Sequence, residues 1–370
     1  MKKKILFLTG PLGGGGAERV LVDILRNFDY DRYDVDLALI SAEGVLLPEV
    51  PPQVNVISLW NGYALEYKIA YRLSKYLGCN ALFAKTLRER LPQKYDVEIS
   101  FLEGMPLKLH AMISSSARKI TWVHCDLDKF RYEASQFFDG EEIAAYNKMD
   151  EIVIVSQDAK KAFDKRFPDC RTHKRVIYNP IDRDKIVRMS SEMEVHNDKF
   201  TIVTVGRLTL QKAIDRVVRL ARRLKDEGID VLFKIIGEGE LRQDLSEQIS
   251  RYGVQDSVEL CGFMNNPFPV VKSADMMLCP SFSEGFCLVI CEAMCLGVPI
   301  VSTKTSGPCE IIGDNEFGIL CEHNDESIYR AVKCMIEDKA LREYYGEKSL
   351  QKASSFDIDS TMQRIYEVIG

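Results

Sequence analysis

The feature that most constrains this chain is an alternation of short apolar segments, rich in Ile, Val and Leu, with longer segments of helical periodicity. The apolar segments do not alternate strictly between polar and apolar residues, which is typical of strands buried on both faces of a parallel sheet. The first series of expected strands covers residues 4–9, 35–40, 54–58, 97–101, 119–123, 151–155 and 175–178. After a polar stretch the pattern restarts at residues 201–205, 230–236, 258–261, 276–279, 299–302 and 318–320.

Two successive series of this kind predict an α/β protein with two doubly wound, Rossmann-like domains. The length of 370 residues suits two domains of roughly 150–200 residues each. We predict an N-terminal domain over residues 1–182, a linker or hinge over 183–199 and a C-terminal domain over 200–355. In such sheets ligands bind beyond the carboxyl ends of the strands, so the loops there should carry the functional motifs.

Charge and cysteine spacing narrow the classes of function. The formal net charge of −6 argues against a nucleic-acid binder, which needs a dominant positive field. The first apolar run, residues 5–8, is too short for a signal-peptide core, and no segment approaches the ~20 apolar residues of a membrane span. No C-x-x-C pair occurs, and Cys287, Cys291 and Cys295 recur at a spacing that predicts one buried helix side rather than a metal site. We therefore expect a cytoplasmic protein with reduced cysteines.

A glycine-rich turn follows the first expected strand. Gly13 to Gly16 are consecutive glycines, and Ala17 and Glu18 then open a helix. Glycines let backbone N–H groups approach a phosphate closely, and a helix N-terminus adds partial positive charge. The loop has neither the Gly-Lys-Ser/Thr of a P-loop nor the later ribose-binding acid of a dinucleotide fingerprint. The pattern favours a ligand-binding turn, with a merely tight turn as the alternative.

Two cations follow the first strand of the second series. That strand ends at Gly206 and Arg207, and Lys212 comes shortly afterwards. The pair suits a diphosphate, because each charged hydrogen bond is worth ~1.5–3 kcal/mol. An exposed pair on a loop is the alternative. Gly237 and Gly239 end the next strand and would let a base or ribose approach, although an ordinary turn explains them equally well.

The most informative stretch runs from Pro280 to Ala293 and reads PSFSEGFCLVICEA. Glu284 is expected on the loop before a helix, and Glu292 just over one turn inside it. A helix rise of ~1.5 Å per residue places the two carboxylates on the order of 10 Å apart, which matches the length of a sugar nucleotide. The backbone at the helix N-terminus between them would donate to a diphosphate. A surface Glu together with a helix-capping Glu is the less favoured interpretation, because a bare carboxylate on this apolar helix would be costly.

These residues resemble the retaining glycosyltransferases of the GT-B fold, specifically glycosyltransferase family 4, the group 1 transferases. The likeness covers nearly the whole chain, and its most specific part is the Glu-x7-Glu pair with the Gly-Val-Pro that follows at residues 297–299. The other matching positions are Gly15 to Glu18, His124, Asn179 to Asp182, Gly206, Arg207, Lys212 and Gly237 to Gly239.

The resemblance implies roles for individual residues. Arg207 and Lys212 would neutralise the donor diphosphate, Glu284 would hold hydroxyls of the donor sugar, and Glu292 would hold the ribose. His124, after the strand 119–123, would approach the donor sugar near the reacting carbon, so the implied catalytic residues are His124, Glu284, Arg207 and Lys212. The implied nucleotide-sugar site comprises Gly15, Gly16, Gly206, Arg207, Lys212, Gly237, Gly239, Gly262, Phe263, Glu284, Gly285, Phe286, Cys287, Leu288 and Glu292.

The resemblance also implies an architecture and a mechanism. The two domains should face each other across a cleft and close around the donor, and a C-terminal helix within 356–370 should pack on the first domain. Transfer would retain the anomeric configuration by front-face displacement, with no metal and no other cofactor. The D-x-D pair Asp126 and Asp128 resembles a metal-binding signature, but we discount it because two cations already serve the leaving diphosphate.

A basic and aromatic stretch at residues 60–94 bears on the acceptor. It contains seven Lys or Arg against two Glu, together with aromatic residues that include Tyr63. Such a stretch can lie on an anionic membrane, and a solvated helix face is the alternative. The expected partners are a nucleotide-sugar donor, taken to be a UDP-sugar, a glycan or lipid-linked saccharide of cell-surface polysaccharide or glycoconjugate synthesis, and the membrane surface. A nucleotide-sugar epimerase, a binding protein without transfer activity and a nicotinamide oxidoreductase are the competing interpretations.

Overall fold

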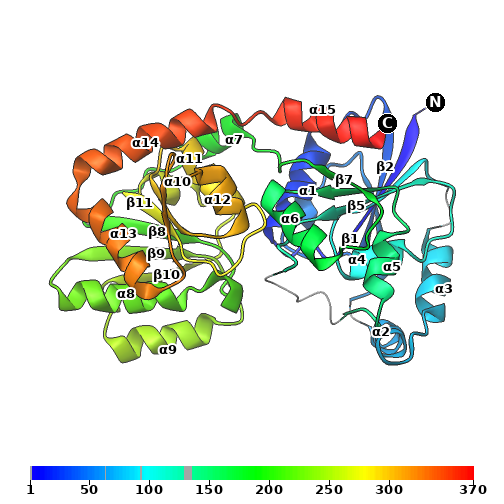
Figure 1. The fold of residues 1–370 in the computed structure, drawn as a ribbon, viewed down its shortest axis with the longest axis horizontal. Coiled ribbons are helices and arrows are strands. Elements are labelled where there is room, and N and C mark those ends of the chain that lie inside the picture. Colours follow the sequence, from blue (N-terminus) through cyan, green and yellow to red (C-terminus); the bar gives the residue numbers. More distant parts are fainter. Residues whose placement is uncertain (1, 63, 92–93, 129–135) are drawn as a thin grey trace. The chain divides into compact units, whose positions relative to one another are not determined.

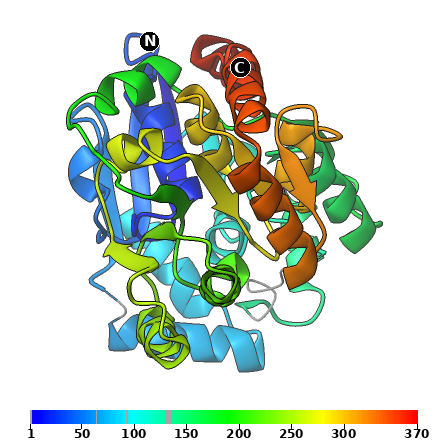
Figure 2. The ribbon, with the colours of Figure 1, turned by 90° about the vertical axis from the view of Figure 1, so that its left-hand side faces the viewer.

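The computed structural model describes residues 2–62, 64–91, 94–128 and 136–370. The chain divides into two compact units, each built around a sheet with helices on both faces (Figure 1; Figure 2 shows the ribbon turned by 90°). Unit 1 comprises Met1–Pro180 together with Asp359–Gly370, and unit 2 comprises Ile181–Ile358. The chain therefore passes from one unit to the other twice.

Unit 1 contains a seven-stranded parallel sheet in the order β3-β2-β1-β4-β5-β6-β7. Its strands are β1 Lys3–Thr9, β2 Tyr33–Ser41, β3 Asn55–Trp60, β4 Val97–Ser100, β5 Arg118–Val123, β6 Glu151–Ile154 and β7 His173–Val176. The described helices of this unit are α1 Gly16–Arg26, α2 Leu65–Leu77, α3 Ala81–Arg90, α4 Met105–His110, α5 Glu141–Tyr146, α6 Gln157–Arg166 and α15 Ile358–Ile369.

Unit 2 contains a six-stranded parallel sheet in the order β10-β9-β8-β11-β12-β13. Its strands are β8 Phe200–Val205, β9 Val231–Ile236, β10 Val258–Gly262, β11 Met276–Cys279, β12 Ile300–Thr303 and β13 Ile319–Cys321. Its helices are α7 Arg183–Met189, α8 Asp215–Asp226, α9 Arg242–Tyr252, α10 Phe268–Lys272, α11 Leu288–Cys295, α12 Ser306–Ile312, α13 Asp325–Glu337 and α14 Lys339–Ala353, with a 3-10 turn at Leu210–Lys212.

The two series of predicted strands are confirmed. Each predicted strand coincides with an observed one, with ends displaced by no more than two residues. The central strands are buried on both faces: the interior of unit 2 includes Ile202 and Phe233, which contact the apolar sides of α8 and α13. The apolar runs identified the strands because both faces of these sheets are covered by helices.

The segment 183–199, predicted to be a linker, starts with a helix that belongs to unit 2. The carboxylate of Asp182 accepts a hydrogen bond of 2.9 Å from the backbone N–H of Lys185 and caps α7. Ile186 is buried, because α7 packs against α10 and α11. The N-cap and the burial of Ile186 stabilise the helical part of this segment, residues 183–189.

The C-terminal helix α15 packs on unit 1, although it follows unit 2 in the sequence. The ring of Tyr366 stacks on that of Tyr33 with centroids 5.6 Å apart, and it meets Phe28 edge-on at 5.5 Å. Its hydroxyl accepts a hydrogen bond of 2.8 Å from the backbone N–H of Asp29. This aromatic cluster holds the end of the chain against the turn between α1 and β2.

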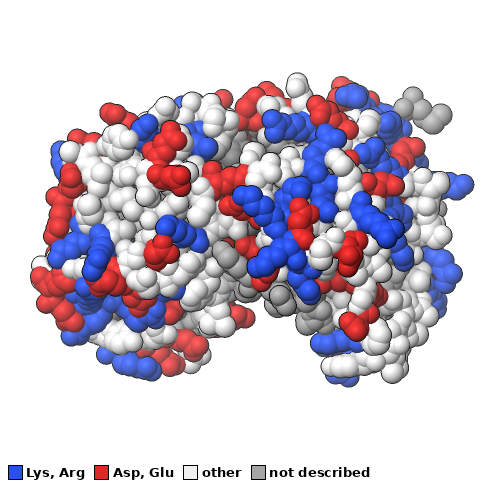
Figure 3. Space-filling view, in the orientation of Figure 1, with Lys and Arg blue, Asp and Glu red and all other residues white. Residues whose placement is uncertain are grey.

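Among the helices of the described residues, none has both the length and the apolarity that a membrane span requires. On the face shown in Figure 3, basic and acidic side chains are interspersed over unit 2. Ion pairs within one helix of unit 2 include Arg219 with Asp215 and Arg222 with Asp226. This part of the surface therefore presents mixed charge rather than a field of one sign.

Candidate functional site

The best-formed site lies at the point where the strand order of the unit 2 sheet reverses. Successive strands run outward from β8 to β9 and β10 on one side and from β11 to β12 and β13 on the other. The helices that follow β8 and β11 therefore cover opposite faces of the sheet, and the two loops lie next to each other at its carboxyl edge. A pocket at this edge is lined by residues of both loops, including Lys212 and Ser281, and by Val289 of α11.

The centre of the site is an ion pair between the two loops. The Nζ of Lys212 lies 2.6 Å from the Oε1 of Glu284, and the hydroxyl of Ser281 donates to the same oxygen at 2.6 Å. Glu284 is only 6% exposed, so its charge needs such partners to be stable. Burial by itself lowers the pKa of Lys212, but the adjacent carboxylate outweighs burial and raises that pKa above its ordinary value. Lys212 therefore stays protonated.

Backbone contacts fix these two loops against each other. The backbone N–H of Phe282 donates to the carbonyl of Gln211 at 2.8 Å, and the side-chain amide of Gln211 donates to the carbonyl of Ser283 at 2.9 Å. The hydroxyl of Thr303 donates to the carbonyl of Ser281 at 2.6 Å. The carboxylate of Glu284 is thus held by a preformed loop rather than by its own side-chain rotamer alone.

Helix α11 begins directly after this loop. Its first residue is Leu288, and Cys287 caps it in a left-handed conformation with φ 68° and ψ 68°. Glu292 lies inside the helix and is half-buried, as the spacing predicted. Burial raises the pKa of the neighbouring Cys295 to about 12, and the negative charge of Glu292 adds to this shift. The expected separation of the Glu284 and Glu292 carboxylates stays a prediction.

The three cysteines spaced along this region do not share one environment, and the prediction of a common helix side was wrong for Cys287. Cys291 and Cys295 are buried on α11 as expected. Cys287 precedes the helix, and its left-handed backbone directs the thiol to Cys279 at the end of β11, where the two Sγ atoms are 3.6 Å apart. A hydrogen bond from Cys287 lowers the pKa of the Cys279 thiol, whereas the pKa of Cys287 is raised.

The predicted glycines of unit 2 have a structural reason of their own. Gly237 has φ +143°, and a Cβ on it would lie 2.0 Å from the carbonyl oxygen of Gly206. A Cβ on Gly239 would lie 2.4 Å from the carbonyl oxygen of Leu208. The loops after β8 and β9 therefore run backbone against backbone, which only glycine allows. Next to them Gly262 has φ +76° and ends β10, and the following Phe263 is 44% exposed.

Arg207 and Lys212, predicted to act as a pair, lie in different environments. Lys212 is engaged by Glu284, as described above. Arg207 is exposed, and within the described residues its guanidinium makes no hydrogen bond or ion pair. The positive charge of Arg207 is therefore uncompensated at this edge of the sheet, and that of Lys212 is not.

The glycine-rich turn of unit 1 is partly occupied by a side chain of its own helix. Helix α1 begins at Gly16, with Gly15 as N-cap. The backbone N–H of Gly15 donates to Oε2 of Glu18 at 2.7 Å. The carboxylate of Glu18 thus already satisfies part of the positive end of the helix. The ligand-binding role of this turn stays a prediction.

His124 follows β5 at the carboxyl edge of the unit 1 sheet. Its backbone N–H donates to Glu103 at 2.9 Å, and its ring packs on Phe101 with centroids 4.9 Å apart. Burial lowers the pKa of His124 to about 3, although a hydrogen bond to the backbone of Phe101 opposes the shift. Its Nε2 is buried and has no hydrogen-bond partner within the described residues. His124 is therefore a neutral imidazole, and one of its ring nitrogens has no hydrogen-bond partner among the described residues.

The two carboxylates of the D-x-D pair near His124 have different surroundings in the part of the chain that the structure describes. Asp126 is buried, and one of its oxygens accepts a hydrogen bond of 3.1 Å from the backbone N–H of Asp128. The carboxylate of Asp128 forms an ion pair with Lys165. Neither belongs to a three-ligand cluster among the described residues.

Comparison with known proteins identifies the family. Residues 14–185 match Glycosyltransferase Family 4, and residues 188–352 match Glycosyl transferases group 1. The chain is 33% identical over 96% of both sequences to the N-acetylgalactosamine-N,N'-diacetylbacillosaminyl-diphospho-undecaprenol 4-alpha-N-acetylgalactosaminyltransferase of Campylobacter jejuni. The chain is a family 4 glycosyltransferase. The predicted family is confirmed, and the enzyme works in polysaccharide or glycoconjugate synthesis.

The solved structures agree on the fold. Anabaena HepE in complex with UDP and glucose superposes with a TM-score of 0.76 at 22% identity, covering 99% of each chain. The two parallel sheets of this glycosyltransferase thus have the GT-B fold.

The sequence comparison also finds a second Campylobacter jejuni relative, a GalNAc-alpha-(1->4)-GalNAc-alpha-(1->3)-diNAcBac-PP-undecaprenol alpha-1,4-N-acetyl-D-galactosaminyltransferase. It is 25% identical over 99% of this chain.

Sequence reasoning missed several residues that build the site of the glycosyltransferase. Ser281 and Gln211 hold the Glu284 loop, and Cys279 faces Cys287. Cys279 ends a predicted strand and Ser281 follows shortly after it, and that position was the available signal. Nothing local in the sequence indicates that Gln211 crosses to the other loop, because the contact depends on the order of the strands.

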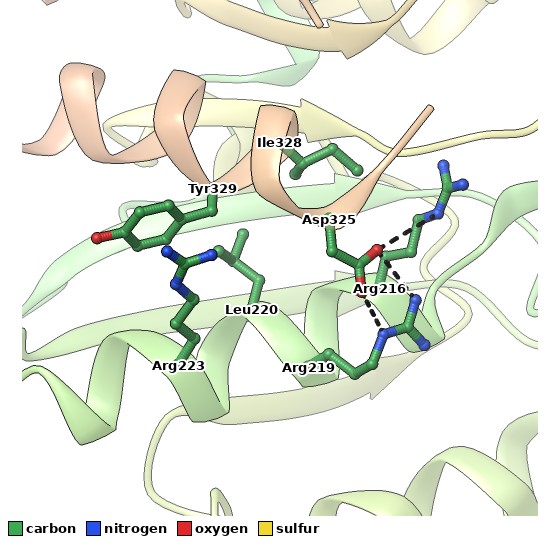
Figure 4. A pocket seen from close by; sticks show the side chains of 7 residues that line it. All are labelled: Arg216, Arg219, Leu220, Arg223, Asp325, Ile328 and Tyr329. Atoms are coloured by element: carbon green, nitrogen blue, oxygen red, sulfur yellow. Dashed lines mark hydrogen bonds and ion pairs between the residues drawn. The ribbon is translucent and has the colours of Figure 1, made fainter. Parts of the chain in front are cut away.

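A larger pocket in unit 2 lies between α8 and α13 (Figure 4), and its Arg216 also donates to the carbonyl of Pro280 at 3.0 Å. Figure 4 shows that Arg216 and Arg219 converge on Asp325, at 3.9 and 2.6 Å, while Arg223 lies 3.3 Å from the centroid of the Tyr329 ring. The arginines of this pocket are thus already paired, which makes it a poor anion site for the glycosyltransferase.

Proposed function

We propose that this glycosyltransferase moves a sugar from a UDP-sugar to a lipid-linked saccharide, with retention of the anomeric configuration and without a metal ion. The observation that carries the proposal is the ion pair between the half-buried Lys212 and the buried Glu284 at the switch point of the unit 2 sheet. Anabaena HepE, which has the same fold, binds UDP and UDP-glucose. The Campylobacter relative at 33% identity acts on an undecaprenol-linked saccharide, as its name states.

The donor is recognised by charge and by shape. Because the charge of Lys212 is shared with Glu284, the uncompensated Arg207 supplies the second cation for the diphosphate. The N-terminus of α11 adds backbone donors next to the same loop. We assign the sugar hydroxyls to Glu284 and the ribose to Glu292, and Phe263 offers an exposed ring against which the base can stack.

The chemical step needs no nucleophilic side chain. The acceptor hydroxyl attacks the anomeric carbon on the face from which the diphosphate leaves, the bond from that carbon to the diphosphate oxygen breaks, and the departing oxygen takes the hydroxyl proton. Catalysis then rests on positioning and on stabilising the charge of the leaving diphosphate. His124 fits a role without proton transfer, because its lowered pKa keeps it neutral and its Nε2 can bond to a sugar hydroxyl.

Calorimetric titration with UDP, GDP and ADP, first without metal and then with magnesium, tests the donor assignment. Tight binding of UDP alone, unchanged by magnesium, is the expected result. Tighter binding of GDP or ADP would mean that the donor carries guanine or adenine instead of uracil. Binding that requires magnesium would contradict the metal-free site. The NMR coupling constant of the anomeric proton in the product, compared with that in the donor, then decides between retention and inversion.

The membrane-facing part of the proposal rests on α2. Its buried side is formed by Tyr67, Ala70 and Ser74. The opposite side exposes Leu65, Ile69 and Tyr76, at 73%, 43% and 68%, with Leu77 exposed at the end of the helix. Lys68, Arg72 and Lys75 lie beside this apolar stripe. In Figure 3 the lower right of the molecule, where Figure 1 places α2, shows uncharged surface bordered by both basic and acidic side chains. Tyr63 and residues 92–93 of the predicted stretch lie outside the described residues.

An apolar stripe with flanking cations is the pattern of a helix that lies in an anionic lipid surface. Flotation with vesicles of phosphatidylglycerol and of phosphatidylcholine tests this. We expect binding to the anionic vesicles only, lost at high salt and in a Leu65→Ser/Tyr76→Ser variant. A Lys160→Ser/Lys161→Ser variant, altered on α6, is the matched control and should bind like the wild type. Equal flotation of all three proteins would refute the α2 surface.

A further inference from the structure

The Glu284 loop holds an unusual set of side chains between β11 and α11. Sγ of Cys279, Sγ of Cys287 and a carboxylate oxygen of Glu284 all lie within 4.8 Å of one another. The three residues are 5%, 6% and 6% exposed. Of the described residues, no other three His, Cys, Asp or Glu side chains come together in this way.

The spacing of the two sulfur atoms matches a metal site. Tetrahedral zinc with Zn–S bonds of about 2.3 Å requires its two thiolates to be about 3.8 Å apart. Cys279 and Cys287 are 3.6 Å apart before any ion binds. The left-handed backbone of Cys287 sets this distance, because it turns the thiol away from α11 and toward the strand.

The charges of the cluster can be balanced with and without an ion. Without one, two neutral thiols share a hydrogen bond and Lys212 neutralises Glu284. With a divalent cation, two thiolates and one carboxylate carry three negative charges, which the cation and Lys212 offset together. Such balance is what a buried charged cluster requires.

We propose that Cys279, Cys287 and Glu284 form a binding site for a thiophilic divalent cation, with Zn²⁺ as the natural occupant. Binding forms two metal–sulfur bonds and one metal–oxygen bond, and releases the two thiol protons to solvent. Thiolates select zinc over Mg²⁺ or Ca²⁺, which prefer oxygen ligands. A water molecule fills the fourth position, as in open zinc sites.

Occupancy of this site would regulate the enzyme rather than assist it. A carboxylate oxygen committed to the cation is withdrawn from the donor sugar, so metal and donor compete. This consequence rests on the role proposed above for Glu284, whereas metal binding itself does not.

The test uses Co²⁺ as a spectroscopic probe on the full-length protein, kept reduced with a phosphine so that the two cysteines cannot form a disulfide. We expect one equivalent of Co²⁺ to give a thiolate-to-cobalt charge-transfer band in the near ultraviolet, which Zn²⁺ then abolishes by displacement. Cys279→Ser and Cys287→Ser should each weaken Co²⁺ binding by about tenfold or more and reduce the band per bound ion. Cys279→Ala and Cys287→Ala, checked for an unchanged thermal unfolding midpoint, serve where a serine variant misfolds.

The exposed Cys79 provides the control, because Cys79→Ser removes a thiol outside the cluster. It should leave both the band and the affinity unchanged. Absence of a band in the wild type, or its loss in Cys79→Ser instead of the Cys279 and Cys287 variants, would overturn the site. Co²⁺ binding with a normal band but without weakening of UDP-sugar affinity would keep the metal site and refute the role of Glu284 in donor binding.

Discussion

In both sheets the candidate functional residues lie in loops at the carboxyl ends of the strands, but the side chains there differ: they are charged in unit 2 and mainly uncharged in unit 1. In unit 2 the loops after β8 and β11 bring the half-buried cation of Lys212 and the buried carboxylate of Glu284 into contact at 2.6 Å. In unit 1 the loop after β1 contributes glycines at a helix end that Glu18 caps. The loop after β5 contributes a neutral His124, whose Nε2 has no hydrogen-bond partner among the residues that the structure describes. The comparison teaches that the shared fold positions loops, whereas the electrostatics of each edge come from the individual side chains.

The largest expected effect is on the charged edge. Glu284→Gln keeps the shape and removes the charge, and we expect kcat/KM for transfer to fall about 10³-fold, the cost of losing one preorganised electrostatic contact. UDP affinity should change by only a few fold, because the diphosphate contacts remain. Steady-state kinetics and UDP titration measure the two quantities. A kcat/KM of Glu284→Gln within tenfold of the wild type would mean that the charged edge of unit 2 does not dominate catalysis.

Lys212→Met leaves Glu284 buried without its cation. We expect a loss of stability of about 1–3 kcal/mol, seen as a lower thermal unfolding midpoint, together with weaker UDP binding. The double variant Lys212→Met/Glu284→Gln should recover much of the stability but not the binding. If the double variant unfolds at as low a temperature as the single one, the ion pair is not the origin of the effect.

Arg207→Ala, which alters an exposed cation, should weaken UDP binding without changing the thermal unfolding midpoint.

A pair of glycine substitutions contrasts the backbones of the two edges. In unit 2, Gly237→Ala places a Cβ 2.0 Å from a carbonyl oxygen, whereas in unit 1 Gly15→Ala places one 3.2 Å from the flexible carboxylate of Glu18. We expect Gly237→Ala to lower the unfolding midpoint clearly and Gly15→Ala to leave it nearly unchanged. Gly10→Ala, whose Cβ meets nothing within 4 Å, is the control. Equal midpoints for the Gly237 and Gly10 variants would contradict the backbone contact.

The smallest effect concerns pH and the neutral edge. The pKa of His124 is lowered to about 3 in the folded protein, against about 6.5 in an unfolded chain. Between these values the unfolded state binds the extra proton, so this residue lowers stability as pH falls below about 6.5. The unfolding midpoint should therefore fall less from pH 7 to pH 5 in His124→Gln than in the wild type. Identical pH dependence would mean that His124 is not buried as a neutral group.

Much of this enzyme could be predicted from the sequence because the deciding signals are local. Continuous runs of Ile, Val and Leu mark strands buried on both faces, and both sheets form from the predicted strands. Since parallel strands point the same way, the residues after β8 and β11 had to meet at one edge. The family followed from the Glu-x7-Glu stretch that contains Glu284 and Glu292, and the comparisons confirm it.

Only the tertiary structure decided which partner each functional side chain takes. The sequence offered Arg207 and Lys212 as equal candidates, but the path of the loop after β8 brings only Lys212 to Glu284. Periodicity assigned Cys287 to the side of a helix, whereas its left-handed φ turns the thiol to Cys279. Helical and strand periods report the repeat of a regular backbone, and both decisions fall in irregular loops whose conformation depends on contacts with distant segments.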